Sequence, residues 1–215
     1  GSTGDSAAFI RQHYSNDVSI QLVKKSLEFF QGFSNEFSCN NVFVNTGWFF
    51  LVPHHAADVF DSNMIRLKNE GIKTWSVSVS DLLDELPGIN TGGIGRVAFE
   101  PESGYVDPHA MVEAVVNQGV KNGGEFTINN PVIGIDTSGN TSIVKTSAGD
   151  IETKIVINAA GPWAHQIGLW MDIDLPLEIS REQDIMVRPN NDASAITRCV
   201  SNMVDRTYIR AEPDG

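Results

Sequence analysis

The chain has 215 residues, of which 41% are hydrophobic and 20% charged, and its net charge is −12. Its 27 acidic against 15 basic residues argue against a nucleic-acid partner, because affinity for a phosphate backbone requires a basic face. No apolar run reaches the roughly 18 residues that a membrane-spanning helix needs. Cys39 and Cys199 are too far apart to indicate a disulfide framework or a metal site. The N-terminus lacks the basic and apolar regions of a signal peptide, so we expect a cytoplasmic protein.

The first half of the chain predicts a series of helices and strands. Their bounds, in chain order, are a helix at 16–30, a strand at 41–53, a helix at 56–71, a strand at 75–79 and a short helix at 80–86. Ser15 or Asn16 can cap the first helix and Ser80 the last, because their side-chain oxygens accept bonds from free helical N–H groups. Pro53 is expected to end the first strand.

The clearest helical pattern begins at Asp107-Pro108. Aspartate serves as the N-cap, and proline is the first helical residue, where its missing N–H does no harm. Gly123 and Gly124 then supply a left-handed residue that closes the helix. Four strand-like segments follow, at 125–128, 132–136, 142–146 and 151–158. The connections within the last three are short enough for hairpins, which indicates a small antiparallel meander.

The last of these segments ends in small residues, Asn158-Ala159-Ala160-Gly161. A dinucleotide lying across the ends of parallel strands places its pyrophosphate against main-chain N–H groups, and larger side chains would obstruct that approach. Taken alone, the four residues fit an ordinary tight turn better than a cofactor site. The order of elements, a helix, a strand, a meander and then a strand ending in small residues, favours the second half of a dinucleotide-binding domain.

Four segments resemble the D-amino-acid oxidase and sarcosine oxidase superfamily of FAD-dependent oxidoreductases, and they occur in the family's order. They are "GSTGDSAAFIRQHYSNDVSIQLVKKSLEFF" (1–30), "GYVDPHAMVEAVVNQGVKNGGEF" (104–126), "VINAAGPWAHQIG" (156–168) and "DRTYIRAEPDG" (205–215). The first is most similar to the sarcosine oxidase β-subunit and dimethylglycine dehydrogenase-like branch. The family's Gly-x-Gly-x-x-Gly loop and its C-terminal glycine-rich segment have no counterpart. We therefore expect an internal fragment that binds FAD poorly by itself.

One internal segment matches a dinucleotide fingerprint, "GIGRVA" at residues 93–98. It follows a loop rather than a strand, and the "FEPESG" after it cannot form a helix. Because a glycine-rich loop binds phosphate only between a strand and a helix, we reject this segment as a cofactor site.

The resemblance implies an α/β (α+β) fold in which a Rossmann-like FAD/NAD(P)-binding domain is interleaved with a mixed, largely antiparallel substrate domain. Residues 1–41 and 105–175 would form part of the FAD-binding domain, and 42–104 and 176–215 part of the substrate domain. The implied cofactor is FAD, bound by Ser2, Thr3, Gly4, Val132, Asn158, Ala159, Ala160, Gly161 and Trp163. For Trp163, anchoring the turn in a core is the stronger expectation than stacking on the flavin.

The resemblance also implies three residues at the substrate. In the sarcosine oxidase branch, an arginine at the place of Arg11 pairs with the substrate carboxylate, a role that suits its bidentate geometry; an ordinary ion pair is the alternative. The family often has "GGIRQ" where this chain has "AFIRQ". Tyr208 and Arg210 alternate with Ile209 on a predicted strand, so both face one side, toward either substrate or solvent. His13 and Tyr14 are expected to be packed aromatic residues.

The implied reaction is oxidation of the C–N bond of an amino acid or N-methyl amino acid, such as sarcosine, dimethylglycine, glycine or a D-amino acid, with hydride transfer to FAD. A flavoprotein of the same fold that oxidises a 2-hydroxy acid or glycerol phosphate is the nearer alternative. The more distant one is a non-catalytic acidic interaction domain. The expected partners are a small amino-acid-like substrate and an additional subunit or electron acceptor, with no metal.

Overall fold

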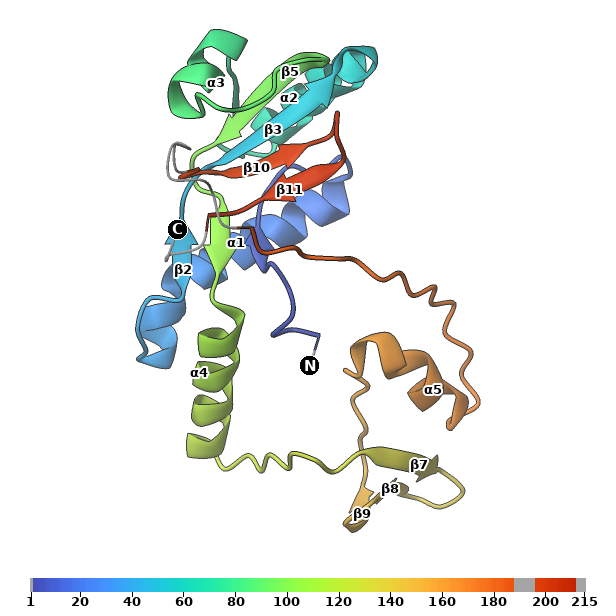
Figure 1. Cartoon of the computed structure of the whole chain (residues 1–215). Helices are drawn as coiled ribbons and strands as arrows, with labels where there is room; N and C mark the ends of the chain where they lie inside the picture. Colours follow the sequence, from blue (N-terminus) through green and yellow to red (C-terminus); the bar gives the residue numbers. More distant parts are fainter. Residues whose placement is uncertain (1, 188–195, 212–215) are drawn as a thin grey trace. The chain divides into compact units, whose positions relative to one another are not determined.

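The computed structural model describes residues 2–187 and 196–211, and these fall into two units (Figure 1). The first unit comprises the described residues from 3 to 118 and from 184 onward, and the second comprises residue 2 and residues 119–183. The predicted division into FAD-binding and substrate domains uses other boundaries and stays a prediction. The predicted turn at 212–215 lies outside the described residues.

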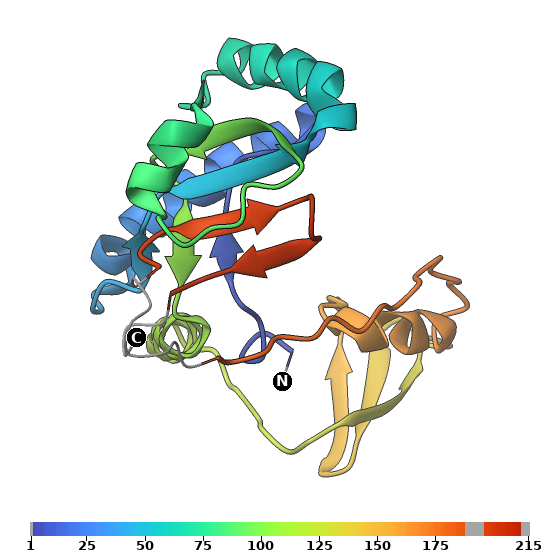
Figure 2. The same cartoon turned by 45° about the horizontal axis from the view of Figure 1, so that its top comes forward.

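A five-stranded sheet of order β11-β10-β3-β5-β4 forms the centre of the first unit (Figures 1 and 2). The central strands β3 (Trp48–Pro53) and β5 (Ile94–Glu100) are antiparallel, with Trp48 opposite Glu100. β10 (Cys199–Asn202) runs parallel to β3, while the edge strands β4 (Trp75–Ser76) and β11 (Thr207–Ile209) are antiparallel to their neighbours. The predicted mixed, largely antiparallel sheet is confirmed.

Helices cover both faces of this sheet, because β3 and β5 carry apolar side chains in both phases of their alternation. On one face, α1 (Asp17–Phe37) and α2 (Ala57–Asn69), which follows the short η1 (His54–Ala56), pack against the sheet. On the other face, α3 (Val79–Glu85) buries Leu82 against Leu51 and Val97.

A small antiparallel sheet of order β1-β6-β2 carries the beginning of the chain. β6 (Gly104–Val106) lies between β1 (Phe9–Ile10) and β2 (Phe43–Asn45). Gly104 is required here because a Cβ atom at this position would lie 2.0 Å from the carbonyl oxygen of Val44. This pairing holds residues 9–10 beside Tyr105, which matters for the site described below.

The second unit begins in the last turn of α4 (Pro108–Lys121) and contains an antiparallel meander of β7 (Val132–Asp136), β8 (Ser142–Thr146) and β9 (Gly149–Thr153). A short η2 (Gly161–Trp163) and α5 (Ala164–Leu169) come after it. The predicted ends of α4 are confirmed: Asp107 Oδ1 accepts hydrogen bonds from the His109 and Ala110 N–H groups, and Gly123 has a φ of +86°.

Two predictions in the first half are corrected. The strand predicted at 41–53 is divided into β2 and β3, which belong to different sheets. Gly47 makes this break with a φ of +68°, and a Cβ atom there would lie 2.6 Å from the Phe99 ring. The short helix begins at Val79 rather than after Ser80, because the Ser78 hydroxyl accepts the capping bond from the Asp81 N–H.

Two predictions in the second half are also wrong in extent. Residues 125–128 do not form a strand. The strand predicted at 151–158 ends at Thr153, which pairs with Ser142 as the last residue pair of the β8–β9 ladder. Beyond that pair β8 supplies no further partner, so residues 154–158 remain outside any strand despite their β-branched composition.

Across the described residues, none of the helices combines the length and the apolar character that crossing a membrane requires.

Candidate functional site

Arg11 follows β1 and lies against two tyrosine rings. Its guanidinium carbon is 5.0 Å from the Tyr14 ring centroid and 5.7 Å from the Tyr208 ring centroid. Such cation–π contacts orient a guanidinium without neutralising its charge. Arg11 is partly buried, and within the described residues no carboxylate lies within ion-pair distance of it. The alternative prediction, an ordinary ion pair, therefore has no partner in this part of the chain.

Tyr208 and Arg210 both reach the N-terminal segment from β11 and the residue beyond it. The Tyr208 ring lies 6.1 Å from the Phe9 ring, and Tyr208 is 49% exposed. Arg210 Nη1 donates a 2.6 Å hydrogen bond to the Ala7 carbonyl, and its guanidinium lies 4.5 Å from the Tyr105 ring centroid. The sheet thus brings Arg11, Tyr208 and Arg210, the three residues predicted at the substrate, into one region of the first unit.

A buried aromatic layer supports this region. Phe9 packs edge-to-face on Trp48 at 4.7 Å, and Trp48 Nε1 donates to the Ser201 hydroxyl at 2.9 Å. Cys199 completes the cluster and is fully buried. Burial raises the pKa of the Cys199 thiol, against the opposing effects of a hydrogen bond from Thr46 and the charge of Arg210. Cys199 is therefore a neutral packing residue here.

Glu100, at the end of β5, was not anticipated from the sequence. It is completely buried, and its carboxylate accepts hydrogen bonds from the Gln12 backbone N–H and the Ser103 hydroxyl, both at 3.0 Å. His13 Nδ1 lies 3.2 Å from the second carboxylate oxygen. The His13 ring is also stacked on Phe50 at 4.1 Å, which agrees with its predicted packed role. The available signal was the apolar composition of β5, which indicates a strand covered on both faces.

The small-residue segment in the second unit forms a turn with accessible main chain. Asn158 ties the turn together: its Nδ2 donates to the Ala164 carbonyl at 2.9 Å and its Oδ1 accepts from the Ala160 N–H at 3.2 Å. Gly161 has a φ of +53°, and no atom lies within 4 Å of the position a Cβ would occupy. A large group can therefore approach this backbone, as the predicted cofactor contact requires.

Other predicted cofactor residues have mixed surroundings. Trp163 is 66% exposed, so the expectation that it anchors the turn in a core is wrong; the small second unit offers no buried site for its ring. Val132 is exposed at the start of β7. Ser2 and Thr3 are exposed, whereas a Cβ on Gly4 would lie 2.7 Å from the His109 ring.

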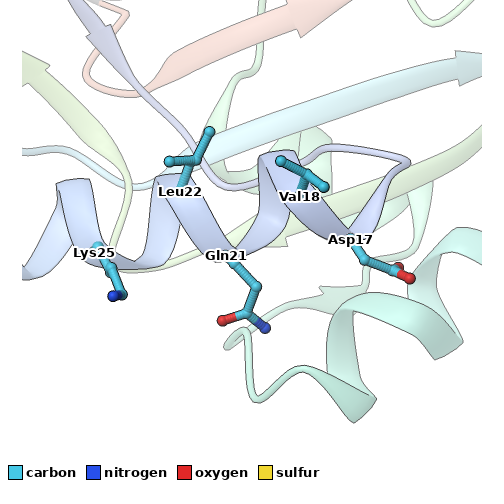
Figure 3. Close-up of a pocket in the computed structure, with 5 residues that line it drawn as sticks. All are labelled: Asp17, Val18, Gln21, Leu22 and Lys25. Atoms are coloured by element: carbon cyan, nitrogen blue, oxygen red, sulfur yellow. The ribbon is translucent and has the colours of Figure 1, made fainter.

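An open surface hollow, here called the groove, lies at the beginning of α1, and Figure 3 shows the residues that line it. Its lining residues are Asp17, Val18, Gln21, Leu22 and Lys25. All come from one helix, and none is a residue predicted to bind substrate or cofactor. The groove is therefore separate from the candidate site.

Comparisons with known proteins show the family to which the chain belongs. A family model described as "FAD dependent oxidoreductase" (DAO) matches residues 1–215. Human dimethylglycine dehydrogenase is 23% identical over 162 residues, covering 74% of this chain and 19% of that protein. Human sarcosine dehydrogenase is 24% identical over 191 residues, which cover 82% of this chain and 20% of that protein. The chain thus spans about a fifth of the length of these relatives.

Solved structures show the same fold. L-proline dehydrogenase from P. horikoshii superposes with a TM-score of 0.83 at 21% identity, covering 99% of this chain and 57% of that one. L-amino acid deaminase from Proteus myxofaciens gives a TM-score of 0.72 at 23% identity, and the match covers 81% of this chain and 40% of that one. Since the family model spans every residue of the sequence, the chain belongs to the DAO family of FAD-dependent oxidoreductases.

Proposed function

We propose that this protein oxidises the C–N bond of a small amino acid or N-methyl amino acid, with FAD as its cofactor. One observation carries the proposal: Arg11 is a partly buried guanidinium, oriented by two tyrosine rings and without a carboxylate partner among the described residues. An amino-acid substrate supplies the missing carboxylate. The relatives named for dimethylglycine, sarcosine and proline support this substrate class.

Arg11 would bind the carboxylate through two parallel N–H···O bonds, which fix both the position and the plane of the substrate. The Tyr14 and Tyr208 rings restrict the guanidinium to a narrow range of orientations. Holding one end of a small molecule in this way places its reacting carbon reproducibly, and such positioning lowers a reaction barrier without an acid–base residue.

Arg210 would support the same segment through the main chain before Arg11. Its bond to the Ala7 carbonyl fixes the chain four residues before Arg11, and the Tyr105 ring covers its guanidinium. Its positive charge adds to that of Arg11 and favours an anionic substrate. Tyr208, half exposed beside Phe9, would form one wall of the binding region.

FAD, when bound, supplies the acceptor for the hydride that leaves the carbon beside nitrogen. The residues that would hold it are the bare turn at 158–161 and the N-terminal Ser2, Thr3 and Gly4. The open backbone at Gly161 fits a group that lies directly against the main chain. At Gly4 the nearest neighbour is the His109 ring, which would have to shift to admit a Cβ atom.

Replacing Arg11 tests the proposal. In the FAD-containing protein, we expect Arg11→Met to raise KM for its amino-acid substrate about 100-fold, the effect of losing two charge-assisted hydrogen bonds. Arg11→Lys should recover part of the loss, because lysine keeps the charge but not the bidentate geometry. Steady-state oxidation of sarcosine, dimethylglycine, glycine and proline provides the measurement.

Arg66→Met is the matched control, because Arg66 forms an exposed ion pair with Asp17 on another part of the unit. Unchanged KM in Arg11→Met would contradict the proposal. Turnover of lactate or glycerol 3-phosphate without turnover of any amino acid would instead indicate a dehydrogenase acting on a C–O bond.

A further inference from the structure

We propose that Glu100 is a positioning residue for Arg11, holding the segment that presents the guanidinium to the substrate. This inference rests on the proposed function, because it assigns Glu100 a role in carboxylate binding. The two residues do not form an ion pair. Glu100 acts through the two residues that follow Arg11 in the chain, Gln12 and His13.

The contacts of Glu100 hold this segment at two successive residues. One carboxylate oxygen, Oε2, accepts from the backbone N–H of Gln12 and the hydroxyl of Ser103, each at 3.0 Å. The other, Oε1, lies 3.2 Å from His13 Nδ1. A carboxylate that binds a backbone N–H fixes the chain itself rather than a side chain, so the position of Arg11 depends directly on it.

The surroundings make this connection rigid. Glu100, Gln12 and His13 are all buried, with exposed fractions of 0%, 3% and 7%. The His13 ring cannot rotate freely because it is stacked on Phe50 at 4.1 Å with an interplanar angle of 19°. Glu100 is itself fixed at the end of the central strand β5, where it pairs with Trp48 of β3. The central sheet is thereby linked to the loop that carries Arg11.

A carboxylate at position 100 would be unfavourable if this side chain served only to pack the core. Removing a charged group from water is costly, and replacing buried ionic groups by apolar ones often leaves stability unchanged or improved. The preceding residues Val97 and Ala98 are buried and apolar, as a purely structural strand requires. The geometric constraint on residues 11–13 gives the buried carboxylate a function that an apolar side chain lacks.

Binding of a carboxylate probe to the FAD-containing protein tests this role. The probe is acetate, with neutral acetamide as its matched comparison, and binding is followed by the change in flavin absorbance. Glu100→Met removes all three hydrogen bonds at similar volume, and we expect it to weaken acetate binding about tenfold with little change for acetamide. Ser103→Ala removes one bond and should give a smaller loss in the same direction.

Glu100→Gln should bind acetate nearly as the unaltered protein does. Its amide oxygen can keep the bonds to Gln12 and Ser103, and its NH2 group can donate to His13 Nδ1 in the other tautomer. Glu102→Gln is the neighbouring control, because Glu102 pairs with Lys73 at the surface. A purely structural role would lower the melting temperature without altering the preference for acetate over acetamide.

The Arg11→Met variant separates the two proposals. If it loses acetate preference while Glu100→Met and Ser103→Ala retain it, Arg11 binds the carboxylate and the positioning role of Glu100 is wrong. If Arg11→Met itself retains the preference, the proposed function is wrong. Should Glu100→Met not fold, Ser103→Ala decides: an unchanged acetate preference in that variant overturns the positioning role.

Discussion

The two units of this chain differ in how far their apolar side chains are buried. Among the described residues, every buried hydrophobic side chain belongs to the first unit, from Ile20 to Val200. In the second unit the β-branched residues are largely exposed, with Ile128, Ile155 and Ile157 at 83%, 75% and 84%. The first unit therefore has the burial that stabilises a fold, whereas the second depends mainly on the hydrogen bonds of its meander.

This difference coincides with the difference between the two sets of site residues. Arg11, Tyr208 and Arg210 lie over a packed aromatic layer, which fixes their positions. The turn at 158–161 is held by local bonds, those of Asn158 and one from the Trp163 N–H to the Ala160 carbonyl, and leaves the backbone at Gly161 open. A substrate carboxylate requires a rigid cation, while a dinucleotide requires accessible main chain, so each unit has the property that its proposed ligand demands.

Two tryptophans provide the sharpest test of this comparison. Trp48 is fully buried in the first unit, and we expect Trp48→Ala to lower the free energy of unfolding by about 3–5 kcal/mol, because it leaves a large cavity. It also deprives the buried Ser201 hydroxyl of a donor. Trp163→Ala in the second unit should change that free energy by less than about 0.5 kcal/mol, since its ring is exposed. Urea unfolding measures both, and equal losses would refute the distinction.

A smaller effect concerns the reactivity of Cys199, which should report opening of the first unit. The thiol is fully buried, and burial raises its pKa, so both access and thiolate formation are limited. We expect iodoacetamide to modify Cys199 at least about tenfold more slowly than Cys39, which is partly exposed. Mass spectrometry of the two tryptic peptides gives the rates.

The iodoacetamide reaction can also be measured in the Trp48→Ala variant. Trp48→Ala should accelerate modification of Cys199, because the two side chains belong to one cluster. Modification of Cys39 serves as the internal control and should change little. Rapid modification of Cys199 in the unaltered protein would show that the first unit is not the closed core described above.

The helices of this chain could be predicted because their signals are local. Asn16 caps α1 through the Ser19 N–H, and Asp107 caps α4, as the sequence indicates. The central strand β5 offers only its apolar composition as a signal, because glycines precede it and it lacks a two-residue alternation. Glu100 was missed for the same reason: an acidic residue is expected to be buried only if its strand is known to be central.

Long-range pairing limits prediction of the site in a similar way. Tyr208 reaches Arg11 only because β10 adds to β3 in parallel and β11 follows as its hairpin partner. No local pattern specifies that arrangement, so the resemblance to a family supplied it. Conversely, β-branched composition at 155–157 predicted a strand where the ladder has already ended, because propensity alone does not supply a partner strand.

The smallest expected effect is the pH dependence of the β7–β8 hairpin in the second unit. Hydrogen bonds from the backbone N–H and then the hydroxyl of Ser138 lower the pKa of Asp136 below its ordinary value, with a minor contribution from Lys145. The ionised form is thus favoured in the folded hairpin, and the resulting stabilisation is present above the ordinary carboxyl pKa. It is lost as the pH falls through the lowered value, below about pH 4.

Amide chemical shifts of the β7 and β8 residues, followed from pH 6 to pH 2, measure this effect. We expect Asp136→Ala to remove the acidic transition of the hairpin, while Asp150→Ala at the exposed start of β9 leaves it in place. The change should be small because Asp136 is exposed to solvent, where water competes for the same hydrogen bonds. A transition of comparable size in the packed strands β3 and β5 would mean that the two units do not respond to acid separately.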